Sequence, residues 1–240
     1  MIPADDFSSG ENSLNGIELH PRSGMKYLDE MMEYSMQAGG YAEVRKEYNE
    51  LRQILKESYY DENGIGVLIT VGYAICERKY DDKGNVVLLE YKDVQSNPIL
   101  SAEGYASVKR EYNDRSQMVR QTYYDTDMNR IEIGEGYSGI VREYTSAGDI
   151  TMEQWIDNKN NPIVRSEGYT TIHREYDDGR RLIKEIYLAR DGNPVVTKRG
   201  FASMEYKYLD NGPLSLTYCY DDDGNLLEMG SSNLHNYLNQ

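Results

Sequence analysis

The stretch "GYASVKREYND", residues 104–114, decides the fold, because a near copy, "GYTTIHREYDD", occupies residues 168–178. Each is part of a longer series of glycine–aromatic pairs, and every pair follows the previous one after 32 residues. The pairs begin at Gly40, Gly72, Gly104, Gly136, Gly168 and Gly200. Self-similarity at one fixed period, kept from residue 40 to residue 231 without insertion or deletion, predicts a tandem-repeat architecture.

Two runs in each copy alternate apolar and polar side chains with period two, which is typical of half-buried strands. Counting the glycine as position 0, the first run has an apolar residue at position 4, a cation at position 6 in five copies and tyrosine at position 8. The second run starts on an apolar residue at position 14 and ends on an aromatic residue at position 19 in five copies. A third apolar segment around position 27 predicts a third strand. Its central residues are Val67, Ile99, Ile131, Ile163, Val195 and Leu227.

The segments that join these runs are rich in Asp, Asn and Gly, as in "YDDKGN" from Tyr80, and predict tight turns. Asp125 and Asp127 also alternate as oxygen ligands do in a calcium loop. The equivalent pair in the next copy is Asp157 with Lys159, whose ammonium group is incompatible with a bound cation. We therefore predict that the acidic residues form turns, and we predict no metal site and no cofactor.

These patterns predict an all-β protein, an open tandem array of about six 32-residue, three-stranded β-meander repeats. A single unit cannot bury its apolar face, so each copy must stack on its neighbours. The alternative is a six-bladed β-propeller, although propeller blades usually have four strands in about 40 residues.

The repeats divide the chain into four parts. Residues 1–24 are expected to be a flexible leader, since polar and small residues dominate and no apolar period is present. Residues 25–39 are expected to be a partial repeat that caps the array, because Tyr27 and Asp29 match the later half of the unit. The six full copies are residues 40–71, 72–103, 104–135, 136–167, 168–199 and 200–231, and residues 232–240 form a tail.

Composition limits the possible partners. A net charge of −15 disfavours nucleic acid and anionic membrane surfaces, and no apolar run is long enough to insert into a membrane. The beginning of the sequence does not have the pattern of a signal peptide, so we expect a cytoplasmic protein or an excerpt of a cell-envelope protein. Cys76 and Cys219 are too isolated for a disulfide framework, and His173 is expected to be an exposed strand residue. No nucleophile or phosphate-binding motif is present, which argues against an enzyme.

The phrases "REYDDG", "KYDDKGN" and "YDDDGN" resemble the tyrosine-aspartate repeats, called YD or RHS repeats, of bacterial surface and toxin-shell proteins. They are also similar to tyrosine-rich repeats appended to bacterial cell-wall enzymes, including polyglycerol-phosphate transferases of teichoic acid synthesis. The resemblance covers about four fifths of the chain and consists of strand and turn residues. It implies a repeat module associated with the cell envelope.

Two functions remain open. The first is a non-catalytic module that binds a cell-wall polysaccharide or a protein surface through repeated aromatic contacts. The candidate ligand-binding residues are the aromatic residues at position 19: Tyr59, Tyr91, Tyr123, Trp155 and Tyr187. The second is a passive spacer or scaffold, in which these rings are buried. The residues that define the repeat itself are Gly72, Tyr80, Gly104, Tyr112, Gly136, Tyr144, Gly168 and Tyr176.

The cations at position 6 and the tyrosines at position 8 lie on one face of the first strand, as Arg110 and Tyr112 do. Stacked copies would then form an Arg–Tyr ladder with cation–π contacts. We expect this ladder to seal the interface between copies, with the acids at position 7 outside in water. These acids are Glu47, Glu111, Glu143 and Glu175.

Overall fold

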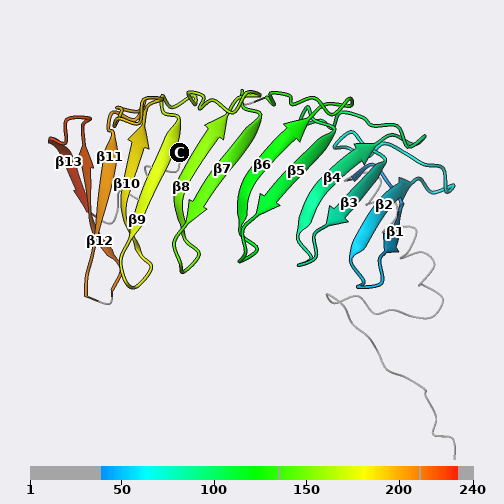
Figure 1. The fold of residues 1–240 in the computed structure, drawn as a ribbon, viewed down its shortest axis with the longest axis horizontal. Coiled ribbons are helices and arrows are strands. Elements are labelled where there is room, and N and C mark those ends of the chain that lie inside the picture. The colour runs from blue at the N-terminus through cyan, green and yellow to red at the C-terminus, as the bar shows by residue number, and fades with distance from the viewer. Residues whose placement is uncertain (1–38, 135, 211, 232–240) are drawn as a thin grey trace, which may run out of the picture.

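The computed structural model describes residues 39–134, 136–210 and 212–231, and these form one antiparallel sheet whose strands follow each other in sequence order (Figure 1). The predicted all-β open array is confirmed, and the sheet does not close as a propeller would. Its strands are β1 (Glu43–Tyr48), β2 (Ile54–Tyr60), β3 (Ile75–Tyr80), β4 (Val86–Lys92), β5 (Ser107–Tyr112), β6 (Met118–Tyr124), β7 (Gly139–Tyr144), β8 (Ile150–Ile156), β9 (Thr171–Tyr176), β10 (Leu182–Leu188), β11 (Ser203–Tyr208), β12 (Leu214–Tyr220) and β13 (Leu226–Ser231).

Each copy contributes one hairpin, made from the two runs of alternating residues. In the second copy, Cys76 of β3 faces Tyr91 of β4, and the register shifts by one residue just before Tyr80. The turn is closed by the Asp81 carboxylate, whose Oδ1 accepts the N–H groups of residues 83 and 85. Gly84 has a φ of +86°, a conformation that glycine adopts without steric cost. The sequence-predicted hairpin turns are confirmed.

The predicted third strand is wrong for the first five copies. There the segment around position 27 makes an isolated bridge and one backbone hydrogen bond to the second strand, as Val67 N–H does to the Tyr59 carbonyl at 3.0 Å. The outer edge of β2 is already taken by β3 of the next copy, so a third strand has no room to pair. In the last copy the same segment forms β13 and pairs with β12 along its length. The segment at position 27 can therefore form a strand, but it does so only where no following copy already pairs with the edge of the second strand.

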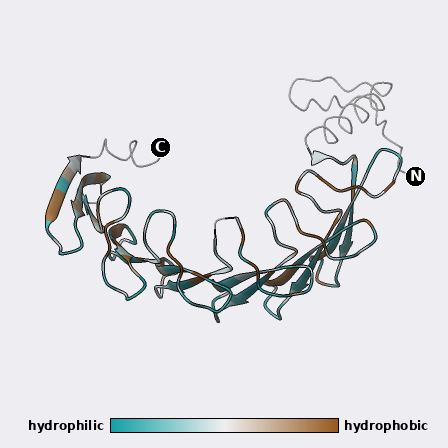
Figure 2. Cartoon of the chain, turned by 90° about the horizontal axis from the view of Figure 1, so that it is seen from above, coloured by the Kyte–Doolittle hydropathy of each residue, from teal (hydrophilic) through white to brown (hydrophobic). Residues whose placement is uncertain are grey.

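Neighbouring hairpins are joined over a short length only. Three residue pairs connect β2 with β3, from Lys56 with Glu77 to Ser58 with Ile75, whereas six connect the two strands of a hairpin such as β3 and β4. Beyond this short pairing the hairpins diverge, and the short turns stand apart along one edge (Figure 1). The sheet as a whole bends into an arc with loops projecting on its concave side (Figure 2).

The tyrosine at position 8 bridges the place where the hairpins diverge. Its hydroxyl donates to the carbonyl of position 14 in the preceding copy, 26 residues earlier, at 2.6 to 3.1 Å. The five bonds run from Tyr80 to Ile54, from Tyr112 to Val86, from Tyr144 to Met118, from Tyr176 to Ile150 and from Tyr208 to Leu182. A phenol is long enough to reach this carbonyl, which explains why the second to sixth copies have tyrosine here and not phenylalanine.

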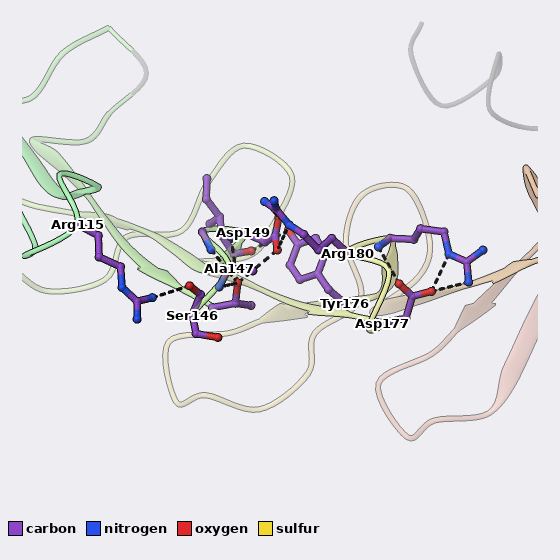
Figure 3. A network of polar contacts seen from close by, with 11 residues as sticks. Arg115, Ser146, Ala147, Asp149, Tyr176, Asp177 and Arg180 are labelled. Carbon is purple, nitrogen blue, oxygen red and sulfur yellow. Dashed lines mark hydrogen bonds and ion pairs between the residues drawn. The ribbon is translucent and has the colours of Figure 1, made fainter. Parts of the chain in front are cut away.

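Polar contacts also link successive short turns (Figure 3). The Arg115 guanidinium donates to the Ser146 carbonyl at 2.6 Å, and Arg180 forms a two-pronged ion pair with Asp149. Arg180 is exposed, so solvent weakens this pair. The edge contacts therefore contribute less to stability than the buried contacts between copies.

The aromatic core lies on the face of the sheet that carries positions 4 and 19. Val108, Ile140, Ile172 and Met204 at position 4 are buried against the rings of positions 1 and 19. Ile131 and Ile163, from the segment after the second strand, pack onto the same cluster. The core therefore runs continuously through the array.

The predicted leader, most of the partial repeat and the tail lie outside the described residues, as do His20 and His235. His173 is exposed on β9, as predicted, and Cys76 and Cys219 are buried free thiols. None of the helical segments that the structure describes is long and apolar enough to cross a membrane.

Removing the hydroxyl of Tyr112 tests the bridge between copies. Tyr112→Phe keeps the ring but loses the bond to the Val86 carbonyl, so we expect the free energy of unfolding in urea to fall by about 1 kcal/mol. Tyr48→Phe is the matched control, because Tyr48 is 55% exposed and makes no such bond to a described residue. We expect the control to stay within about 0.5 kcal/mol of the parent. Equal losses in the two variants would contradict the bridging role.

Candidate functional site

The five aromatic residues proposed from the sequence as ligand-binding all lie in one ladder of rings. Tyr59, Tyr91, Tyr123 and Tyr187 each pack between the position 1 ring of their own copy and that of the next, with ring centres 4.3 to 6.0 Å apart, whereas Trp155 packs on Tyr169 of the next copy only. Tyr73 and Tyr91 lie face to face, and most other pairs meet edge-on or tilted. Between Tyr137 and Trp155, the Arg165 guanidinium lies over both rings, about 5 Å from each centre.

The rings of this ladder are largely buried. Tyr187 is 3% exposed, Tyr123 6% and Trp155 9%, while Tyr59 and Tyr91 are half-buried. Burial raises the pKa of Tyr59 and of Tyr187 to about 12, so both phenols stay neutral at physiological pH. The structure therefore gives these residues a place in the core, and ligand binding by them stays a prediction.

The cations at position 6 form ion pairs and hydrogen bonds rather than the predicted cation–π ladder with position 8. Arg174 Nε donates to Glu185 at 2.9 Å, Arg142 to Glu153 at 2.6 Å, and Arg110 to the amide oxygen of Gln121 at 2.8 Å. These three partners are at position 17 of the same copy, which faces position 6 across the hairpin. Arg78 has Leu89 opposite it and pairs instead with Glu57, at position 17 of the preceding copy. The predicted cation–π pairing is wrong for these residues, because each cation binds a carboxylate or amide oxygen on a neighbouring strand. The acids at position 7 are exposed, as expected.

The acidic residues of the second turn are used by the turn itself. Asp125 Oδ1 accepts the N–H groups of Asp127 and Asn129 at 2.9 and 2.8 Å, and Oδ2 accepts the Asn129 amide. The Asn129 backbone and side-chain donors hold the pKa of Asp125 below its usual value. Donors therefore occupy the oxygens that a cation would need. In the part of the chain that the structure describes, no group of three or more His, Cys, Asp or Glu residues is placed to hold a metal ion.

A polar cleft opens beside the aromatic ladder in the copy that begins at Gly168. Its volume is about 410 Å³, and Glu167, Tyr169, Arg174, Glu185 and Arg199 line it. Tyr187 and Ile172 form the remaining wall. The size is within the range of small-molecule sites.

Sequence reasoning did not select Glu167 or Arg199, although both occupy position 31 of their copies. Earlier copies have Val71 and Glu103 at this position, so Arg199 reverses the charge there. The change from an acidic to a basic residue at position 31 is the sequence feature that could have indicated this cleft, and it shows only when the copies are aligned with one another.

Comparisons with known proteins give low similarities. No protein-family model matches the chain, and no curated protein matches it in sequence. Among solved structures, the chain is similar to the TcdB2-TccC3 complex, with 12% identity, a TM-score of 0.27, and coverage of 78% of this chain and 12% of that one. It is also similar to the Photorhabdus luminescens Tc holotoxin pore, with 12% identity, a TM-score of 0.26, and coverage of 74% and 11%.

At 12% identity and TM-scores of 0.27 and 0.26, these matches do not test the predicted likeness to tyrosine-aspartate repeats, which stays a prediction. This chain spans about an eighth of the length of each matched chain. The likeness of the repeats to those of cell-wall transferases stays a prediction.

Replacing rings of the ladder by alanine tests whether they form the core or a binding surface. In a triple variant, Tyr91, Tyr123 and Trp155 are each replaced by alanine. Each replacement removes about 3 to 5 kcal/mol, so the three together remove about 9 to 15 kcal/mol, which is comparable to the whole stability of an ordinary domain, about 5 to 15 kcal/mol. We expect loss of the cooperative thermal transition, measured by circular dichroism.

The matched control truncates three exposed apolar residues of the loops, Leu68, Leu100 and Val164, which are 44 to 58% exposed. We expect this triple alanine variant to keep its transition. A folded ladder variant would show that the rings are dispensable to the core and would favour a binding surface.

Turn carboxylates make stability depend on pH. Folding lowers the pKa of Asp93, Asp125 and Asp157, so their contribution is present above the ordinary pKa of about 4 and is lost as the pH falls through the folded value. We expect the melting temperature to fall progressively below about pH 4. In the variant with all three changed to asparagine, this fall should be smaller, because Asn49 and Asn113 close hairpin turns of this chain with the same hydrogen-bond pattern, using a neutral amide oxygen. An unchanged pH profile would contradict this role.

Proposed function

We propose that the chain is a non-catalytic structural module, a curved β-array that holds attached parts at a set spacing. The observation that carries this proposal is the burial of the aromatic ladder, with Tyr123, Trp155 and Tyr187 all less than a tenth exposed. The residues that are the same in most copies form contacts between copies. A spacer requires such contacts, whereas a repeated binding groove requires side chains that are exposed to a ligand.

The contacts between copies also support a fixed geometry. Backbone pairing, the tyrosine hydroxyl bond and the ring ladder each join a copy to the next one along the chain. Each hairpin adds two strands, so the array lengthens by about 10 Å per copy at the usual strand spacing. The number of copies therefore sets the distance that the module spans.

The charged side chains on the ladder face support a non-catalytic role. Glu57 pairs with both Lys46 and Arg78, and Glu153 pairs with Arg142. Carboxylates held this way stabilise the joints between strands, and none is paired with a nucleophile. Repeated binding of a polysaccharide or a protein through the position 19 rings stays a second candidate, and the buried ladder does not favour it.

Excising one whole copy tests the scaffold function. Removing residues 104–135 joins the second copy to the fourth in the same register, since the copies are equivalent in length. We expect a folded β protein of lower stability whose longest dimension, measured by small-angle X-ray scattering, is shorter by about 10 Å.

The control removes residues 104–119, half a copy, which deletes β5 and breaks the alternation of strand directions. We expect this variant to lose its cooperative transition. Unfolding of the whole-copy variant would contradict a modular spacer, as would an unchanged length.

A further inference from the structure

The cleft beside Tyr169 differs from the rest of the ladder face because it combines accessible aromatic surface with hydrogen-bonding groups. Tyr169 is half-buried, and its ring centre lies 5.0 Å from that of Tyr187. Glu167 and Arg199 lie on the inter-copy segments, whereas Arg174 and Glu185 lie on β9 and β10. Two copies therefore contribute to one cleft.

Hydrogen bonds hold two of the polar side chains that line the cleft, Arg174 and Glu185, in place. The Glu185 carboxylate accepts Arg174 Nε on one oxygen at 2.9 Å and the Tyr206 hydroxyl on the other at 2.8 Å. Arg174 and Glu185 are 19% and 15% exposed at the side chain. Only Nε of Arg174 bonds within the described part of the chain, so its two terminal nitrogens keep their donor capacity.

Arg199 supplies further free donors. Its Nη2 donates to the Tyr187 hydroxyl at 2.6 Å, and its guanidinium lies over the Phe201 ring, 4.8 Å from the centre. Among the described residues it has no carboxylate within ion-pair distance. The side chain is therefore positioned by aromatic contacts while most of its N–H groups remain unused.

We propose that this cleft binds a neutral saccharide unit. Sugar hydroxyls accept hydrogen bonds and also donate them, so they match the free guanidinium donors of Arg174 and Arg199 and the rim carboxylate of Glu167. The C–H face of a pyranose ring packs on the exposed part of Tyr169. A volume of about 410 Å³ accommodates such a unit.

Charge selects a neutral ligand over an acidic one. Two arginines and two glutamates line the cleft, so its formal charge is zero. The whole chain has a net charge of −15, which repels polyanions at long range. The binding site goes beyond the scaffold function and does not depend on it, because it needs the contacts of three neighbouring copies only, from Glu167 in the fourth copy to Tyr206 in the sixth.

Fluorescence of Trp155 provides the readout, since this is the single tryptophan and its ring centre lies 5.9 Å from that of Tyr169. The full chain is titrated with neutral tetrasaccharides of glucose and of N-acetylglucosamine, and with a galacturonate oligomer of similar length. We expect saturable changes with at least one neutral probe and a weaker response to the galacturonate. Isothermal titration calorimetry checks the stoichiometry, expected to be one.

Arg199→Val and Glu167→Val test the residues, because the chain itself has Val71 at the same repeat position and folds with it. We expect each to weaken binding at least tenfold. Glu103→Val makes the same change at that position two copies before Glu167, outside the cleft, and should bind as the parent does. Tyr169→Phe keeps the ring and should stay within a few-fold of the parent, so it remains informative if a valine variant unfolds.

Three outcomes would overturn the proposal. The first is no saturable binding of any neutral probe. The second is tighter binding of the galacturonate than of every neutral probe, which would assign an anion site. The third is equal weakening by Glu103→Val and Arg199→Val, which would place the effect outside the cleft. None of these outcomes affects the result of the excision experiment, so the scaffold function is tested separately.

Discussion

The hydrogen bond from the position 8 tyrosine to the preceding copy is the constraint on which the rest of the array depends. Backbone pairing between hairpins ends after three residue pairs, and within the hairpin the register shifts just before Tyr80. The hydroxyl then reaches the carbonyl 26 residues earlier and fixes the separation of the diverging strands. An inserted or deleted residue between the two partners would move the carbonyl out of reach, which explains a period of 32 residues kept without exception.

The aromatic ladder depends on the same spacing. A ring at position 19 is covered half by its own copy and half by the next, so a copy cannot bury it alone. Stacking therefore supplies the core, and the open array is stable without closing on itself. It also limits function, since Tyr123 or Trp155 must leave the core before its ring face can meet a ligand.

Sequence periodicity predicted most of the fold, because alternation at positions 4 to 8 and 14 to 19 depends only on which side of a sheet is covered. It failed at position 27, where Val67 and Ile163 are as apolar as a strand residue but the sheet edge is already occupied. Leu227 occupies the same position and does lie in a strand, so no local pattern distinguishes the two outcomes. The burial of Trp155 could not be predicted from its local sequence either. Its burial depends on Arg165 and on the segment around Ile163, which fold over it from the same copy.

Repetition finally separates the positions that hold the array together from those that are free to differ. Position 8 is tyrosine because its hydroxyl joins each of the second to sixth copies to the preceding one, and position 0 is glycine in all copies because the backbone there has a positive φ. The side chain at position 31 makes no contact that is common to all copies, and it changes from Val71 to Glu103 to Arg199 along the chain. A residue at a free position alters one copy without disturbing the spacing of the others. Chemical specificity in this architecture is therefore expected where the repeat is least faithful, and the cleft beside Arg199 lies at such a place.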